Sequence, residues 1–277
     1  MRRASTRASR FPAQSGGAYE RQMGRWSRRL APLLLDFAQI SGAVRVVDVG
    51  CGTGSVGACL ARRPELLHVS GVDLSFAYVD HARRSQADAR LSFVVADAAA
   101  LPFPDACFDH AVSVLALQFM AHPDLAVAEM RRVTRPGGTV AAATWDARGG
   151  LVANRIVLDT AAVLEPGGNI ARARACTKPM SRPGQLAEAW ARAGLTGVVQ
   201  ASTTMRMEFV SFDDYWSPME GTEGPIARYL GGLDRAVRCR LRTAVERAYL
   251  DGEVDGPRSY AATAWIVKGA TPDRGAS

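Results

Sequence analysis

The stretch VVDVGCGTGSVG, residues 46–57, is the part of the sequence best suited to hold a ligand. An apolar run that contains Asp48 ends there, and Gly50, Gly52 and Gly54 follow at alternate positions. Glycines let backbone amides approach a ligand because no Cβ stands in the way. The helix expected after them adds partial positive charge from its N-terminus. The stretch therefore predicts a loop that cradles a cofactor.

The glycine spacing and the acid before it decide between cofactors. A dinucleotide-binding turn reads G-x-G-x-x-G, but here the sixth position is Ser55. A P-loop is excluded because no Gly-Lys-Ser/Thr follows. Asp48 would repel a pyrophosphate and attract a sulfonium ligand with an α-ammonium group. At about 4 Å and an effective dielectric of about 20 that attraction is several kcal/mol at most. An NAD-dependent oxidoreductase is therefore disfavoured.

Two more acids end the next two apolar runs. Asp73, in GVDLS, suits a ribose diol, which donates two hydroxyls to one carboxylate. NAD enzymes share that feature. Asp97, in ADA, can accept a hydrogen bond from an adenine amine while the Ala98 amide donates to the ring. Together the three acids predict a cationic ligand that carries a nucleoside.

The elements that must position these acids alternate along the chain between about residues 30 and 145. Such alternation predicts a parallel sheet, whose ligands lie outside the carboxyl ends of the strands. The blocks 146–184 and 211–258 are less regular and indicate insertions over the sheet edge, with a helix-like stretch at 225–250. We expect strands at 44–50, 68–75, 91–103, 107–117, 139–145, 196–210 and 259–270, and helices at 55–63, 75–89, 124–138 and 183–195.

Four motifs in register resemble those of class I S-adenosylmethionine-dependent methyltransferases, and most of all the UbiE-like group of small-molecule enzymes. They are VVDVGCGTGSVG, GVDLS, VVADAAALPFPDACFD and EMRRVTRPGG. The resemblance covers residues 19–145 well. It implies an α/β, Rossmann-like fold with a seven-stranded sheet in the order 3-2-1-4-5-7-6, the last strand antiparallel, and helices on both faces. It also implies S-adenosyl-L-methionine as the cofactor.

The resemblance assigns the cofactor's parts to residues of this chain. Asp48 and the loop Gly50, Cys51, Gly52, Thr53 and Gly54 would serve the methionine part. Asp73 would hold the ribose, and Asp97 with Ala98 the adenine. Leu74 would pack on the adenine, and Ser75 follows it in the cofactor site. The end of the fourth strand, with Ser113, Val114 and Leu115, would complete the methionine pocket.

The segment YERQMGRWSRRLAPLL, residues 19–34, also resembles one often found ahead of the first motif. Tyr19, Met23 and Trp26 recur every three to four residues and share one helical face. One interpretation is a lid over the cofactor, with Arg25 as a partner for its carboxylate. The other is an amphipathic helix that packs on the sheet. Both stay open for Tyr19 and Trp26.

A general base helps methyl transfer when the acceptor is a hydroxyl or a carbon acid. His122 follows the fourth strand on a loop, and Asp146 follows the fifth. Asp146 could instead cap a helix, and His110 is more consistent with a structural role. Aromatic and sulfur-containing residues suit a hydrophobic or aromatic acceptor and could equally be core: Trp145, Phe209, Phe212, Tyr215, Trp216, Met219 and Tyr229.

Three functions follow for comparison. The first is an enzyme that methylates a small molecule by in-line displacement. The second is a regulatory or interaction protein that binds the cofactor without transfer. The third is an RNA methyltransferase. A DNA N-methyltransferase is disfavoured, because the Asn/Asp-Pro-Pro-aromatic motif of such enzymes is absent after the fourth strand, where the chain reads SVLALQF.

Composition limits the partners and the compartment. The net charge of +7 comes from widely spread arginines, and the chain has two lysines, so we expect no nucleic-acid partner. No apolar run reaches the roughly 20 residues of a membrane span. Five cysteines without a CxxC pair and four histidines without ligand spacing predict no metal site and a cytoplasmic protein. We expect a disordered tail at 1–18 and one methyltransferase domain at 19–277. A homodimer stays open.

Overall fold

Seven strands form one mixed sheet in the computed structural model, which describes residues 15–273. Their order is β3-β2-β1-β4-β5-β7-β6, as the resemblance implied. The first five strands are parallel, and β7 runs antiparallel to both of its neighbours. The strands are β1 (Arg45–Val49), β2 (His68–Asp73), β3 (Leu91–Val95), β4 (Phe108–Val114), β5 (Thr134–Trp145), β6 (Thr196–Phe209) and β7 (Arg258–Ala270).

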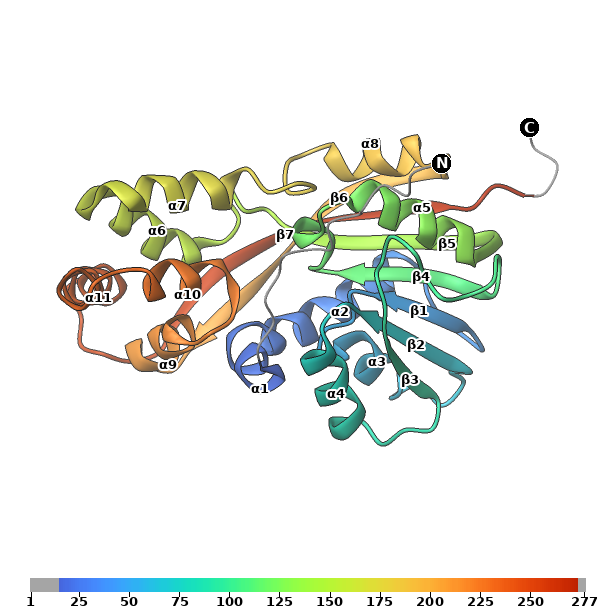
Figure 1. Ribbon diagram of the computed structural model, residues 1–277, viewed down its shortest axis with the longest axis horizontal. Coiled ribbons are helices and arrows are strands. Elements are labelled where there is room, and N and C mark those ends of the chain that lie inside the picture. Colours follow the sequence, from blue (N-terminus) through green and yellow to red (C-terminus); the bar gives the residue numbers. More distant parts are fainter. Residues whose placement is uncertain (1–14, 274–277) are drawn as a thin grey trace, which may run out of the picture.

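Helices cover both faces of this sheet (Figure 1). Helices α2 (Arg25–Phe37) and α3 (Ser55–Leu60) pack on one face, where α4 (Phe76–Ser85) packs beside them against β2 and β3. Helices α5 (Pro123–Val133) and α8 (Gln185–Arg192) pack on the opposite face. Strands buried on both faces need apolar residues at every position, which explains the continuous β-branched runs in the sequence.

The less regular blocks of the sequence form a helical lobe at one end of the sheet (Figure 1). The sequence of block 146–184 shows only loosened periodicity, but that block contains two regular helices, α6 and α7. The lobe consists of α6 (Val152–Leu164), α7 (Pro166–Cys176), α9 (Phe212–Trp216), the 3-10 turn η3 (Ser217–Glu220), α10 (Gly224–Gly231) and α11 (Arg235–Leu250).

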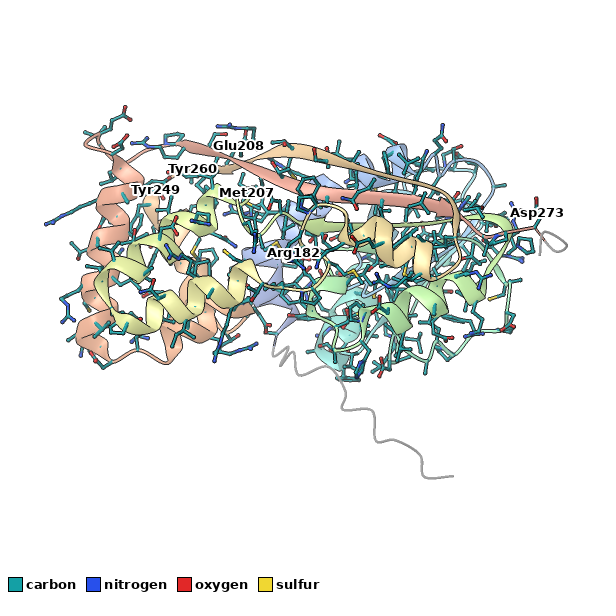
Figure 2. The ribbon with its side chains drawn as sticks, turned by 90° about the horizontal axis from the view of Figure 1, so that it is seen from above. Arg182, Met207, Glu208, Tyr249, Tyr260 and Asp273 are labelled. Atoms are coloured by element: carbon teal, nitrogen blue, oxygen red, sulfur yellow. The ribbon has the colours of Figure 1, made fainter. Side chains whose placement is uncertain are left out.

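Strands β6 and β7 connect the lobe to the sheet. Strand β5 ends where Trp145 pairs with Ala264. Beyond that point, toward Arg258, β7 pairs with β6, and on its other edge it makes one isolated bridge, between Ala262 and Leu151. Figure 2 shows Met207, Tyr249 and Tyr260 close to one another where this ribbon enters the lobe. The two strands thus extend beyond the sheet as a two-stranded ribbon.

The start of the described chain corrects part of the predicted tail. Residues 1–14 of that tail lie outside the described residues. Helix α1 (Gly16–Tyr19) begins within it, capped by the Ser15 hydroxyl, which accepts a hydrogen bond from the Ala18 amide at 3.3 Å. A Cβ at Gly16 would lie 2.4 Å from the Cβ of His81. Close packing on α4 therefore orders a segment whose composition resembles a tail.

Helix α5 is shorter than we expected. It ends at Val133 rather than at residue 138, and the next residues begin β5. Thr134 pairs with Phe108, and the register shifts before His110 pairs with Thr139. Pro136 and Gly137 therefore lie in an irregular part of a strand rather than in a helix end. The expected strands at 91–103 and 107–117 likewise end earlier, at Val95 and Val114.

Within the described residues, no helix is long and apolar enough to span a bilayer. No group of three or more potential metal-binding side chains occurs in the same range. All five cysteines are free.

Candidate functional site

A cavity of about 670 Å³ lies between the carboxyl ends of the central strands and the helical lobe. Of the predicted site residues, six do not line it: Asp48, Cys51, Thr53, Gly54, Ser113 and Asp146. The others do: Tyr19, Arg25, Trp26, Gly50, Gly52, Asp73, Leu74, Ser75, Asp97, Ala98, Val114, Leu115 and His122. Gln118 and Lys178 are among the other residues that line it, and the sequence did not single them out.

The glycine loop turns with backbone angles that favour glycine. Gly50, Gly52 and Gly54 have φ values of 75°, 54° and 89°, a region that side chains with a Cβ rarely adopt. A Cβ at Gly50 would also lie 2.2 Å from the Cβ of Ala116. The loop therefore needs these glycines for both conformation and space.

Two side chains that the sequence analysis missed hold the loop in place. The Thr53 hydroxyl donates to the Glu20 carboxylate, which also pairs with Arg28. The Gln86 amide donates to the carbonyls of Thr53 at 2.9 Å and Gly54 at 3.0 Å. Both partners are distant in sequence, so no local pattern marks them.

Asp48 is buried directly beneath the loop. Its side chain is 2% exposed, and Oδ1 has no hydrogen-bond partner among the described residues. Burial and the nearby Asp73 charge raise the pKa of Asp48 to about 8. A buried carboxylate without a partner is unfavourable, and a cationic ligand nearby would stabilise it.

Asp73 lies at the end of β2, on the cavity wall. Its Oδ2 accepts from the Gly52 amide and its Oδ1 from the Ser75 amide, both at 2.9 Å. Burial raises the pKa of Asp73, although these amides and that of Leu74 act in the opposite direction. The carboxylate thus ties the glycine loop to the start of α4 while it faces the cavity.

Cys51 is not a nucleophile of this site. The thiol is buried with Val79, Ala82 and Phe93. Burial raises its pKa well above the usual range, and Asp48 and Asp73 raise it further. The thiolate is the reactive form, so Cys51 acts as a small packing residue.

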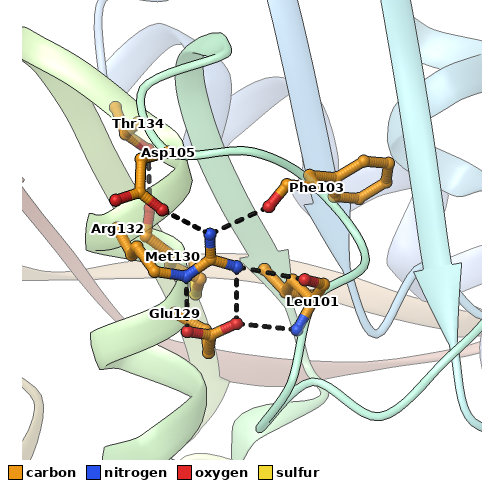
Figure 3. Close-up of polar contacts among 7 residues, drawn as sticks. All are labelled: Leu101, Phe103, Asp105, Glu129, Met130, Arg132 and Thr134. Carbon is orange, nitrogen blue, oxygen red and sulfur yellow. Dashed lines mark hydrogen bonds and ion pairs between the residues drawn. The ribbon is translucent and has the colours of Figure 1, made fainter.

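Asp97 lies just beyond β3. This strand pairs with β2, which ends at Asp73, on the side away from β1 and the glycine loop. Its Oδ1 accepts from the Ala99 amide at 2.9 Å. The chain beyond it is fixed by Arg132 of α5, which donates to the carbonyls of Leu101 at 3.0 Å and Phe103 at 2.8 Å (Figure 3).

The same guanidinium pairs with two carboxylates. Arg132 Nε and Nη2 bond both oxygens of Glu129, at 2.7 and 2.8 Å, and Nη1 bonds Asp105 at 2.7 Å. Glu129 Oε2 also accepts from the Leu101 amide at 2.7 Å (Figure 3). Two of the sequence motifs, VVADAAALPFPDACFD and EMRRVTRPGG, therefore bind one another.

The end of β4 forms another part of the cavity wall. Leu115 has a φ of 61°, which is unusual for a branched residue, and its amide donates to the Ala143 carbonyl at 2.8 Å. Gln118 Oε1 accepts from the Trp145 amide at 3.0 Å. The hydroxyl of Ser113 is buried without a partner among residues 15–273.

The N-terminal helical segment covers the glycine loop. The Tyr19 hydroxyl lies 3.3 Å from Ser27 Oγ, and the Tyr19 ring packs 4.8 Å from that of Tyr78. A Cβ at Gly52 would lie 3.5 Å from the Tyr19 hydroxyl. Burial raises the pKa of Tyr19 to about 12, so the phenol stays neutral.

Arg25 has a partner within the protein. Its Nη1 bonds Asp214 Oδ1 at 2.9 Å, and its guanidinium stacks over the rings of Trp26 and Phe209. These contacts tie α2 to α9. A bond from Arg25 to the cofactor carboxylate, which we expected, stays a prediction and would compete with Asp214.

The two candidate bases differ in position. His122 lines the cavity directly before α5. Asp146 does not line it, and its Oδ1 accepts from the amides of Arg148 at 3.1 Å and Gly149 at 3.3 Å. Asp146 thus stabilises a turn and does not cap a helix, because the next helix, α6, begins at Val152 with Leu151 as its N-cap residue. His110 Nδ1 accepts from the Thr139 amide at 3.3 Å, and burial lowers its pKa.

The predicted aromatic residues divide between cavity and core. Trp145, Phe209, Tyr215 and Met219 line the cavity. Phe212, Trp216 and Tyr229 do not, and Trp216 is fully buried.

Residues 47–142 match the model of a family described as a methyltransferase domain. This stretch of the chain is therefore similar to a methyltransferase domain. The matched part holds β1, β2, β3, β4 and most of β5.

Relatives and solved structures resemble the chain to different extents. A malonyl-(acyl-carrier protein) O-methyltransferase of Erwinia pyrifoliae is 42% identical over 41% of this chain and 42% of its own length. The UbiE ubiquinone/menaquinone biosynthesis C-methyltransferase of Bordetella avium is 35% identical over 36% of this chain and 41% of its own. The chain thus matches less than half the length of these relatives. A Haemonchus contortus phosphoethanolamine N-methyltransferase 2, in complex with S-adenosyl-L-methionine, shares the fold with a TM-score of 0.58, at 16% identity, over 93% of this chain and 57% of its own.

S-adenosylmethionine is the cofactor of such methyltransferase domains, and the residues present fit it. The buried, unpartnered oxygen of Asp48 suits a cationic ligand. Gly50 and Gly52 leave the backbone accessible on the cavity wall. The carboxylates of Asp73 and Asp97 face the same cavity. The site therefore holds acids of the kind that a ligand with a cation, hydroxyls and an amine needs.

Proposed function

We propose that the chain is an enzyme that transfers a methyl group from S-adenosylmethionine to a small, apolar acceptor. The observation that carries the proposal is the division of one cavity into two ends. Asp73 and Asp97 face one end, with Asp48 beneath the adjoining loop. The helical lobe supplies an apolar wall to the other, with Leu158, Tyr215, Met219 and Ile226 among its residues.

Each acid takes one part of the cofactor in this proposal. Asp48 attracts the cationic methionine part, and binding lowers its pKa from about 8. Asp73 accepts hydrogen bonds from the ribose hydroxyls, and Asp97 with Ala98 binds the adenine edge. Leu74 and Ser75 line the adenosine part, and Ser113, Val114 and Leu115 the methionine part. Tyr19, together with Trp26, closes the site as a lid.

The cofactor supplies a methyl group on a positively charged sulfur, and the acceptor's electron pair forms the new bond to carbon while the C–S pair stays on sulfur. The protein contributes alignment and the exclusion of water. His122 is the candidate that takes a proton when the acceptor is a hydroxyl or a carbon acid, because it faces the cavity. Asp146 is the weaker candidate, since its carboxylate bonds a turn.

Thermal unfolding tests the cofactor assignment. Saturating S-adenosylhomocysteine should raise the melting temperature by mass action, and NAD should not. At 100 times Kd, the ligand adds about 2.7 kcal/mol to the free energy of unfolding. Calorimetry with the same two compounds measures the affinities directly. A chain that S-adenosylhomocysteine leaves unchanged would not be the proposed enzyme.

A protein that binds the cofactor without transfer is the alternative that this binding test leaves standing. Incubation with methyl-labelled S-adenosylmethionine and small-molecule extracts separates the two, because only the enzyme moves label into an extractable product. Labelled RNA in a parallel reaction tests the RNA methyltransferase alternative. Light scattering of the purified chain measures whether it is a homodimer.

A further inference from the structure

Both acidic and basic side chains line the cavity. Asp73 and Asp97 lie on the side that we assign to the cofactor. Arg25 is paired with Asp214. The remaining charged residue on the wall is Lys178, one of only two lysines in the sequence. Its contacts distinguish it from an ordinary surface lysine.

Lys178 lies just beyond the end of α7, in the connection that crosses back from the lobe to the sheet, where Figure 2 labels Arg182. Its ammonium lies 4.1 Å from the centre of the Phe119 ring. Phe119 belongs to the 3-10 turn η2 (Leu117–Phe119), which follows β4 and lines the cavity. The side chain therefore points from the lobe toward the strand ends instead of into solvent, where long charged side chains place their heads.

Among residues 15–273, no carboxylate pairs with Lys178. The charged group close enough to affect it is Arg228 of α10, another cation without an ion pair in the described part of the chain. Burial, followed by the Arg228 charge, lowers the pKa of Lys178 to about 8. A partly buried ammonium facing a cavity without a counter-ion is unfavourable, and an anionic ligand would compensate it.

We propose that Lys178 binds an oxyanion of the methyl acceptor, so that the acceptor is an apolar molecule carrying a carboxylate or similar group. The apolar lining residues of the lobe would contact its body, and Phe119 would hold the ammonium in place. The proposal rests on the proposed function, because the cofactor must occupy the end with Asp73 and Asp97 for the acceptor to meet Lys178.

Matched probes test this preference without any turnover. 4-Phenylbutyrate and 4-phenylbutanol share an apolar body and differ in the anionic group. We would titrate each into the full chain saturated with S-adenosylhomocysteine and follow binding by calorimetry. A hydrogen bond to a charged group typically contributes about 1.5–3 kcal/mol, so wild type should bind the carboxylate at least about tenfold more tightly than the alcohol.

Substitutions assign the preference to one residue. Lys178→Met should remove it, and Lys178→Arg should keep most of it. Lys268→Met is the matched control, because the other lysine lies on β7, outside the cavity wall, and bonds Gln39 Oε1 at 3.0 Å. It should leave the preference unchanged.

Three results would overturn the proposal. They are equal affinity of wild type for both probes, an unchanged preference in Lys178→Met, and no binding of either probe. Binding of S-adenosylhomocysteine alone is measured first. Its absence would refute the proposed function, whereas normal binding of it with no carboxylate preference would refute only the role of Lys178.

Discussion

The Tyr78 hydroxyl donates a hydrogen bond to Glu223 Oε2 at 2.7 Å, which joins α4 beside the cofactor loop to the segment before α10. The other oxygen, Oε1, accepts from the Ser15 amide at 2.8 Å. Glu223 is 1% exposed. Three segments that are far apart in sequence therefore meet at one buried carboxylate beside the cavity.

Glu223→Ala should weaken the junction of these three segments. The change leaves the Tyr78 hydroxyl and the Ser15 amide without this partner, and an unsatisfied buried polar group costs about 1–3 kcal/mol. We expect the free energy of unfolding to fall by about that amount in urea titrations, and the Kd for S-adenosylhomocysteine to rise. Glu220→Ala, at an exposed position three residues earlier, is the control. Equal stability of the two variants would contradict the role of Glu223.

Arg132→Lys should weaken the loop after β3 although it keeps the charge. An ammonium cannot reproduce the fork that bonds Glu129, Asp105 and two carbonyls. We expect a loss of about 1–3 kcal/mol in unfolding free energy, together with weaker cofactor binding, because Asp97 precedes this loop. Arg131→Lys is the matched neighbour on the exposed side of α5. If both variants unfold at the same urea concentration, the network does not stabilise the loop.

Asp48→Asn should change how stability depends on pH in the ligand-free protein. The pKa of Asp48 is raised in the folded state from 3.8 to about 8, so its favourable contribution is complete below about pH 4 and is lost as pH rises through 8. The slope between these limits is up to about 1.4 kcal/mol per pH unit.

The measurement is urea unfolding of both proteins from pH 5 to 9. Wild type should lose stability relative to Asp48→Asn as pH increases. Asp36→Asn, at an exposed carboxylate, should follow wild type. A constant difference between wild type and Asp48→Asn would show that Asp48 is already ionised throughout.

Asp73→Asn should weaken nucleoside binding because the amide offers one acceptor oxygen where the carboxylate offers two. Wild type should bind adenosine more tightly than 2′,3′-dideoxyadenosine, and the variant should lose this difference, with at least about tenfold weaker binding of S-adenosylhomocysteine. Asp80→Asn is the control, because Asp80 lies on α4, the helix that follows Asp73, and pairs with Arg84. Retention of the preference in Asp73→Asn would rule out the ribose assignment.

The positions of the acids near the strand ends could be predicted because their signals are local. Asp48, Asp73 and Asp97 each stand at or near the end of an apolar run, and the parallel sheet brings such ends together. The sheet order came from the resemblance. Lys178, Glu223 and Glu20 could not be found in this way, because their partners lie far away in sequence and neither spacing nor residue type marks them.

The two helices of 146–184 escaped prediction for a physical reason. Helix α7 begins with Pro166 and two glycines, a combination that is typical of a turn. Pro is tolerated at the first helical position, where no backbone donor is needed, and the Glu165 side chain caps the helix by accepting from the Gly167 amide at 2.9 Å. A Cβ at Gly168 would lie 2.2 Å from the Ala161 carbonyl oxygen, so that glycine allows α6 and α7 to approach closely.

The ribbon formed by β6 and β7 gives the molecule a natural place for recombination. The family match stops at residue 142, just before β5 ends, and the lobe that would line the proposed acceptor end lies beyond this match. A chimera that exchanges the lobe at the ribbon would keep the glycine loop, the acids and their supporting network intact. Such grafts would show whether the proposed acceptor end can be exchanged once the new lobe again offers carboxylates to Arg25 and Tyr78, as Asp214 and Glu223 do here.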